Sequence, residues 1–173
     1  MDYRPEEYNK FYIVQALFKL MAEYEYGKIS VIDIVNKAGV SRATFYRNFK
    51  KKEDVISYYF THHTEEFALN NRYYPRCKKD YIKTVTNVMT AFKQQMQPLK
   101  LIKKARLEYV YLDYLNDSFS DKFENEYPQS NKYQPYIYAG LLFNVSMAWL
   151  DSDCAEPIEN LAELIVNAIY FEE

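Results

Sequence analysis

Hydrophobic side chains recur along most of the chain with the period of an α-helix. Near its start, a stripe of apolar positions predicts a helix from about residue 5 to residue 26: Phe11, Val14, Leu17, Phe18 and Met21. Strand-like alternation is scarce, and only three glycines and six prolines interrupt the 173 residues. The pattern predicts an all-α protein.

Two short helices joined by a tight turn are predicted between residues 29 and 55. Val31 and Ile34 recur at helical spacing, and Ser30 stands where the N-cap of the first of these helices is expected. Gly39 follows, and glycine readily adopts the left-handed conformation that a sharp helix end requires. The segment therefore has the pattern of a helix-turn-helix unit.

The second of these helices leaves polar and basic side chains on its surface. Ser41 is placed to cap its N-terminus, and Phe45 and Phe49 lie four residues apart on the face that we expect to be buried. The remaining surface carries Arg42, Ala43, Thr44, Tyr46, Arg47 and Asn48. Such side chains can read base edges in a DNA groove or bind phosphate.

The remainder of the chain predicts a connecting helix and a C-terminal helical bundle. The connecting helix covers residues 52–70. Further helices are expected over residues 79–96, 98–114, 135–150 and 157–171, with a looser acidic segment between residues 114 and 134. We expect residues 1–52 to form a three-helix domain and residues 53–173 to form a second domain.

Charge is segregated along the chain, although the net charge is only −2. Residues 28–52 carry seven basic side chains and one acidic side chain, whereas residues 113–173 carry two basic and twelve acidic ones. The N-terminal segment therefore suits the phosphates of DNA, and the C-terminal half repels them.

These motifs resemble the DNA-binding signature of the TetR family of bacterial transcription regulators. The resemblance covers the turn, the second cap and the aromatic and basic positions that follow: Ala38, Gly39, Val40, Ser41, Thr44, Tyr46, Phe49, Lys52 and Glu53. The chain departs from the commonest pattern at Ala43, Asn48 and Val55, where glycine, histidine and leucine are frequent. The resemblance implies a homodimeric repressor that binds a palindromic double-stranded DNA operator and responds to a small-molecule effector.

Candidate contacts to DNA lie on and around the second helix of the unit. Arg42, Ala43 and Arg47 are the candidates for base readout, because arginine can bond to guanine and an alanine methyl can meet the thymine methyl. Both arginines are equally compatible with phosphate contacts. Phosphate contacts are expected from Ser30, Ser41, Thr44, Tyr46, Asn48 and Lys52.

Aromatic residues make up 18% of the chain and include nineteen tyrosines. In the TetR family, an effector in the C-terminal bundle commonly changes the spacing of the two recognition helices. The candidates for lining such a pocket are Tyr59, His63, Tyr109 and Trp149. Ordinary core packing is the more common role of any single aromatic residue.

The last two predicted helices resemble the dimerisation helices of the same family. Ala139, Gly140 and Ala148 are small enough to let two helices approach closely. The resemblance implies an interface across a two-fold axis that contains Tyr136, Gly140, Val145, Ile158, Leu161, Ile165 and Ile169.

Other classes of protein find little support. No catalytic motif is present, so we expect no enzyme and no cofactor. The adjacent His62 and His63 point about 100° apart on a helix, and this angle disfavours a metal site. The chain has no apolar leader and no apolar run of about 18 residues, so we expect a cytoplasmic protein without membrane association. Cys77 and Cys154 are expected to be free thiols. The alternative function is a TetR-like coactivator whose acidic C-terminal half binds a protein partner.

Overall fold

The computed structural model describes residues 5–70 and 77–170, apart from the side chains of residues 5, 6 and 63–70. Within these ranges the chain forms helices and no strand. None of the described helices combines the length and the apolar character that a membrane crossing needs. The all-α prediction is therefore confirmed.

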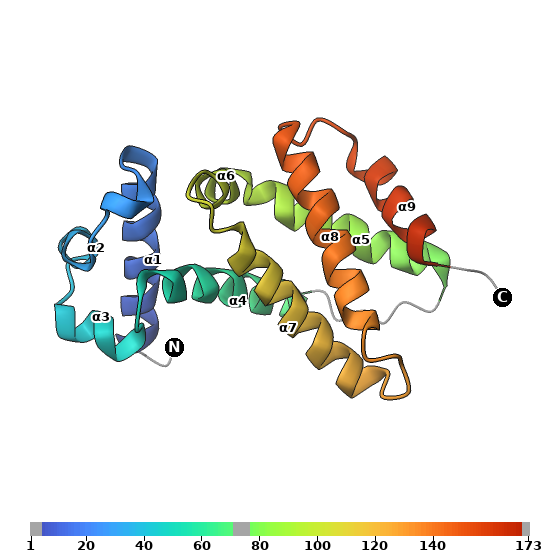
Figure 1. Cartoon of the computed structure of the whole chain (residues 1–173), viewed down its shortest axis with the longest axis horizontal. Coiled ribbons are helices and arrows are strands. Elements are labelled where there is room, and N and C mark those ends of the chain that lie inside the picture. The colour runs from blue at the N-terminus through green and yellow to red at the C-terminus, as the bar shows by residue number, and fades with distance from the viewer. Residues whose placement is uncertain (1–4, 71–76, 171–173) are drawn as a thin grey trace.

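Three helices form the N-terminal part of the molecule (Figure 1). They are α1 (Pro5–Glu23), α2 (Val31–Ala38) and α3 (Arg42–Asn48), and both α2 and α3 pack against α1. A short 3-10 helix, Tyr26–Lys28, precedes α2. The first helix is therefore shorter than predicted, because the extended backbone of Glu25 separates it from the 3-10 turn.

One face of each of these helices contributes to a common core. Fully buried side chains include Ile13, Leu17, Ile34 and Phe45, together with Val55 and Ile56 of the helix that follows. Each such side chain contributes about 1.5–3 kcal/mol by its burial. Phe11, predicted to belong to the buried stripe, is instead 50% exposed and lies beside Tyr12 on the solvent side of α1.

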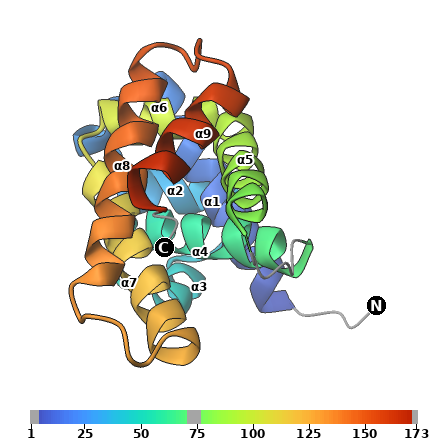
Figure 2. The ribbon, with the colours of Figure 1, turned by 90° about the vertical axis from the view of Figure 1, so that its right-hand side faces the viewer.

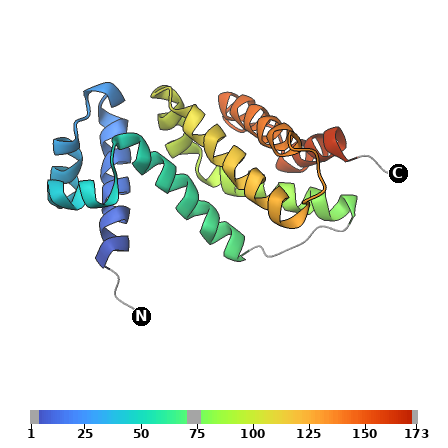
Figure 3. The same ribbon diagram turned by 60° about the horizontal axis from the view of Figure 1, so that its bottom comes forward.

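The long helix α4 leads from this domain into the C-terminal bundle. The described helices of this part are α4 (Lys52–Asn70), α5 (Lys78–Gln94), α6 (Met96–Lys104), α7 (Glu108–Glu126), α8 (Gln134–Asp151) and α9 (Ile158–Ile169). Helix α5 packs along α9, and α7 packs between α4 and α8 (Figures 2 and 3). Helix α6 crosses the end of the bundle nearest the N-terminal domain and contacts α1.

The helix predicted over residues 98–114 is in fact two helices. The break occurs because Arg106 adopts a left-handed backbone conformation, with φ of 57°. The amides of Arg106 and Leu107 bond to carbonyls one turn back, at 2.9 and 3.0 Å, which is the Schellman pattern of a helix end. Glycine usually occupies the left-handed position after a helix end, so the arginine at residue 106 gives no sequence signal of the break. The acidic segment, expected to be looser, is helical up to Glu126.

Helix α2 ends with the same arrangement, here at the predicted glycine. Gly39 has φ of 69°, and the amide of Val40 bonds to the carbonyl of Val35 at 3.1 Å. The prediction that Gly39 supplies a sharp helix end is therefore confirmed.

The two helix ends predict opposite effects of substitution. Arg106→Gly should raise the free energy of unfolding by up to about 1 kcal/mol, because glycine adopts this φ without a steric penalty. Gly39→Ala should lower it by about 1 kcal/mol, and this loss is conformational because an added β-carbon meets no atom within 4 Å. Urea denaturation followed by circular dichroism measures both. Changes of the same sign would contradict this explanation of the two turns.

Candidate nucleic-acid interface and internal cavity

A capping box holds the start of α2. The Ser30 hydroxyl accepts a hydrogen bond from the Asp33 amide at 3.2 Å. The Asp33 carboxylate in turn accepts from the Ser30 hydroxyl at 2.6 Å and from the Ser30 amide at 2.8 Å. These bonds lower the pKa of Asp33. The Ser30 hydroxyl, expected to contact phosphate, therefore already donates its proton within the chain.

Helix α3 has one buried face and one open face. Phe45 is fully buried, and its ring centroid lies 5.8 Å from that of Phe49. The residues that are exposed on the rest of the helix are Arg42, Ala43, Tyr46 and Arg47. In Figure 1, α3 lies at the edge of the molecule that faces away from the C-terminal bundle. The exposed face can therefore approach a large partner without obstruction by the bundle.

Three polar side chains predicted for DNA binding lie together on one side of α3. The Ser41 hydroxyl accepts from the Thr44 amide at 3.0 Å and lies 2.9 Å from the Thr44 hydroxyl. The Asn48 amide group donates to the Thr44 carbonyl at 2.7 Å. These bonds cap the helix and fix the side chains, so this side of α3 is a preorganised polar surface.

Lys52 joins two segments of the N-terminal domain. Its Nζ donates to the carbonyls of Tyr26 and Ile29, at 3.0 and 2.5 Å, and lies 4.3 Å from the centroid of the Tyr26 ring. The Tyr26 hydroxyl donates to Glu53 Oε1 at 2.8 Å, and burial together with this bond raises the pKa of Tyr26. The structure thus ties the first turn of α4 to the turn before α2. The ammonium of Lys52 stabilises this junction in addition to any phosphate contact.

Two neighbouring lysines are exposed beside α3 and were not singled out by the sequence. The backbone amides of Lys50 and Lys51 donate to Asp54 Oδ2 at 2.8 and 3.0 Å, while both residues remain exposed to solvent. Their only sequence signal is the basic run that ends at Lys52. Exposed ammonium groups at this place extend the basic surface of α3.

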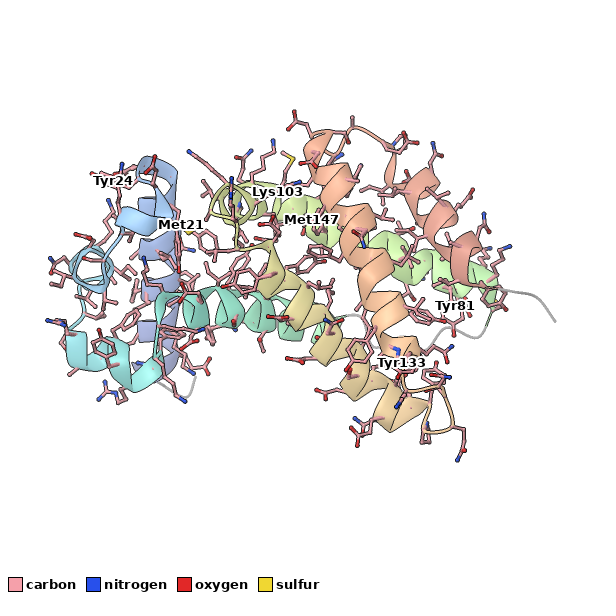
Figure 4. The ribbon with its side chains drawn as sticks, in the orientation of Figure 1. Met21, Tyr24, Tyr81, Lys103, Tyr133 and Met147 are labelled. Atoms are coloured by element: carbon pink, nitrogen blue, oxygen red, sulfur yellow. The ribbon has the colours of Figure 1, made fainter. Side chains whose placement is uncertain are left out.

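A cavity of about 840 Å³ lies within the C-terminal bundle. Side chains of α4, α5, α6, α7, α8 and α9 contribute to its wall, and most of them are aromatic or aliphatic. Tyr81, labelled in Figure 4, lines the end of the cavity farthest from the N-terminal domain. Such a cavity can hold a small molecule.

Of the four residues predicted for a pocket, Tyr59 lines this cavity. Tyr109 is 49% exposed and lies off the wall, because it precedes the lining residue Tyr111 by only two positions of a helix. Trp149 is buried outside the lining, and its Nε1 donates to the Glu156 carbonyl at 3.1 Å. The side chain of His63 falls outside the described residues.

Tyr59 contacts three parts of the molecule. Its ring centroid lies 4.7 Å from that of Phe18 on α1, and its hydroxyl donates to Gln95 Oε1 at 2.7 Å. The same side chain forms part of the cavity wall, and its burial raises its pKa. Tyr59 therefore links the cavity to the N-terminal domain and to the junction of α5 and α6.

Large apolar side chains are exposed to solvent on α8 and α9. Tyr136 is 54% exposed, Ile137 61% and Leu164 62%. A β-carbon added to Gly140 would meet no atom within 4 Å, so a second helix can approach the backbone of α8 closely at this residue.

The other residues predicted for a dimer interface lie deeper. Val145, Ile158 and Ile169 are half-buried. Leu161 and Ile165 are buried in the bundle of their own chain, because α9 turns this face toward α5. Both side chains are therefore core positions of their own chain, and their place in an interface stays a prediction.

Residues 13–59 match the family described as bacterial regulatory proteins, tetR family. No curated protein matches the chain. Among solved structures, the chain is similar to Lin0861 from Listeria innocua, with a TM-score of 0.80 at 19% identity over 97% of this chain and 93% of that one. It is also similar to the fatty acid degradation regulator FadR from Bacillus halodurans, with a TM-score of 0.56 at 18% identity over 96% and 95% of the two chains. These likenesses show a shared fold.

The contacts of Lys52 predict that its removal weakens the N-terminal domain. Lys52→Met should lower the free energy of unfolding by about 1–3 kcal/mol, because two partly buried carbonyls lose a charged donor. Lys51→Met is the matched control and should change stability by less than about 0.5 kcal/mol, because its ammonium is exposed. Thermal unfolding of both variants tests this. Equal stability of the two variants would show that the Lys52 bonds contribute nothing measurable.

Proposed function

Because residues 13–59 match the family described as bacterial regulatory proteins, tetR family, we propose that the chain is a homodimeric repressor of transcription. In this proposal the dimer binds a palindromic DNA operator in the cytoplasm and releases it when a small molecule fills the cavity of the C-terminal bundle. The chain acts as a regulator and not as an enzyme. A protein that shares this fold carries the name of a regulator, FadR.

The open face of α3 is the observation that carries the DNA-binding proposal. A short helix with a buried Phe45 and exposed Arg42 and Arg47 can enter the major groove with both guanidinium groups directed at DNA. The exposed Lys50 and Lys51 can meet the phosphates beside the groove. We assign Arg42, Ala43 and Arg47 to base readout. Phosphate binding is assigned to Ser41, Thr44, Tyr46, Asn48 and Lys52, and also to the two exposed lysines.

The outer face of α8 and α9 supports the proposal of a homodimer. Ile137 and Leu164 are large apolar side chains that are more than half exposed, and Gly140 lets a second helix approach closely. A second copy related by a two-fold axis would cover the same face on both chains. It would also place two α3 helices about 34–36 Å apart, one turn of DNA, or further when the operator is released.

The position of Tyr59 supports control by a small molecule. A ligand in the cavity contacts a residue whose ring also packs on Phe18 of α1. A shift of α4 upon binding therefore changes the position of α1, and with it the position of α3. The cavity favours this mechanism over the coactivator alternative, in which a protein partner would act on the outer surface.

Selection from a random pool of duplex DNA tests the DNA-binding proposal. We expect enrichment of sequences with two inverted half-sites. Arg42→Ala should alter the preference at a single position of each half-site by about 1–3 kcal/mol. Lys51→Ala should weaken binding to all sequences alike and reduce the salt slope of log K by about 0.9 for each phosphate contact that is lost. A folded protein that retards no duplex at low salt would refute the proposal.

Sedimentation velocity tests the homodimer. Leu164→Glu should convert the dimer to a monomer without loss of helical content, because this side chain is 62% exposed within one chain. Tyr109→Glu, which changes an exposed aromatic on α7, is the control and should leave the dimer intact. A dimer that survives Leu164→Glu and Ile137→Glu together would place the interface elsewhere.

A further inference from the structure

The cavity of the C-terminal bundle differs in character between its two ends. We propose that its ligand is an elongated, uncharged, mostly apolar molecule with a hydrogen-bond acceptor at the end nearest the N-terminal domain. This inference names the ligand class of the sensing site and rests on the function proposed above.

The shape of the cavity follows from the helices that line it. On α7 the lining residues run from Tyr111 to Glu126, a rise of about 22 Å at 1.5 Å per residue. The inner end lies at Tyr59 and Gln95, close to α1, and the outer end lies at Tyr81, labelled at the far end of the bundle in Figure 4. A space of this length and of about 840 Å³ suits an extended molecule.

Charged side chains of the described wall are confined to the outer end. They are Lys122 and Glu126, whose Nζ and Oε2 lie 3.9 Å apart and whose side chains are 43% and 34% exposed. The wall near Tyr59 consists of apolar and aromatic groups such as Phe60, Phe92 and Leu99. A charged group buried at this inner end would lose its hydration and gain no counter-ion, so the ligand must be neutral there.

A directed hydrogen-bond donor faces the inner end. Because the Tyr59 hydroxyl donates to Gln95 Oε1, the NH₂ group of Gln95 is the end of this amide that can still donate. Among the described residues, the bond from Tyr59 is the hydrogen bond that the Gln95 side chain makes, so its NH₂ group has no acceptor there. The Tyr111 phenol on the cavity wall also carries no charge near neutral pH, and burial raises its pKa further. An ester, ketone or other acceptor on the ligand satisfies the Gln95 donor without introducing charge.

The competing pose reverses the ligand. A chain with a terminal carboxylate can insert its apolar end first and leave the carboxylate near Lys122 at the outer end. The two poses differ in the residue that determines affinity. Gln95 determines it in our proposal, and Lys122 determines it in the competing pose.

Matched ligands of one chain length distinguish the poses. N-phenyl-1-naphthylamine, a neutral fluorescent probe, is bound first and then displaced by methyl decanoate, decanoate or decylammonium. We expect the ester to displace it with an affinity at least about tenfold higher than that of either ion. The proposal is overturned if decanoate binds as tightly as the ester and loses affinity in Lys122→Gln, or if the ester displaces no probe.

Two variants at the inner end test the role of the donor. Gln95→Met keeps the length of the side chain and should weaken the ester about fivefold while the affinity for the fluorescent probe is unchanged. Tyr59→Phe keeps the NH₂ group of Gln95 and should retain the preference for the ester. Unchanged ester affinity in Gln95→Met would refute the assignment of the donor. If Gln95→Met does not fold, as judged by circular dichroism, the ratio of ester to acid affinity in the unmodified protein decides the proposal.

DNA release is measured separately, by fluorescence anisotropy of a labelled operator duplex. An ester that binds without releasing DNA would leave the ligand class standing and refute the proposed regulation. An ester that fails to bind, in a protein that still binds DNA, would refute the ligand class alone.

Discussion

The first turns of α4 are packed into two regions of the molecule at once. Val55 and Ile56 are fully buried in the core of the N-terminal domain, and Tyr59 and Phe60, one turn later, line the cavity of the bundle. Because protein cores are close-packed, neither region can change its contacts with α4 without moving the other. The packing of Tyr59 on Phe18 adds a direct contact between the cavity wall and α1. The orientation of α3 therefore depends on how α4 is held.

Helix α6 provides a second connection between the C-terminal bundle and the N-terminal domain. Lys100 and Lys103 of α6 pair with Asp153 and Asp151 at the end of α8, and α6 also contacts α1. Exposed ion pairs of this kind contribute little to stability, and α6 also packs directly against α8. The helix that carries the proposed dimer face is thereby connected to the N-terminal domain. In the proposed dimer, both the cavity and the dimer face can therefore influence the spacing of the two α3 helices.

Local signals were sufficient for most of the N-terminal domain. Ser30 and Ser41 cap their helices and Gly39 ends α2, as predicted, because caps and turns depend on residues within one turn of each other. The burial of Phe45 and Phe49 followed from their spacing. The break at Arg106 could not be predicted, because its left-handed conformation is imposed on a residue that does not favour it.

The sequence by itself determined the all-α fold, the helix-turn-helix unit and the polarity of charge, since each depends on periodicity, capping or composition. Only the tertiary structure decided that Tyr111 and not Tyr109 faces the cavity, that Leu161 and Ile165 are core positions, and that the Lys52 ammonium joins two backbone segments. The physical reason is the same in each case. An apolar or basic residue has the same character in a cavity, a core or an interface, and its role depends on which helix packs against it.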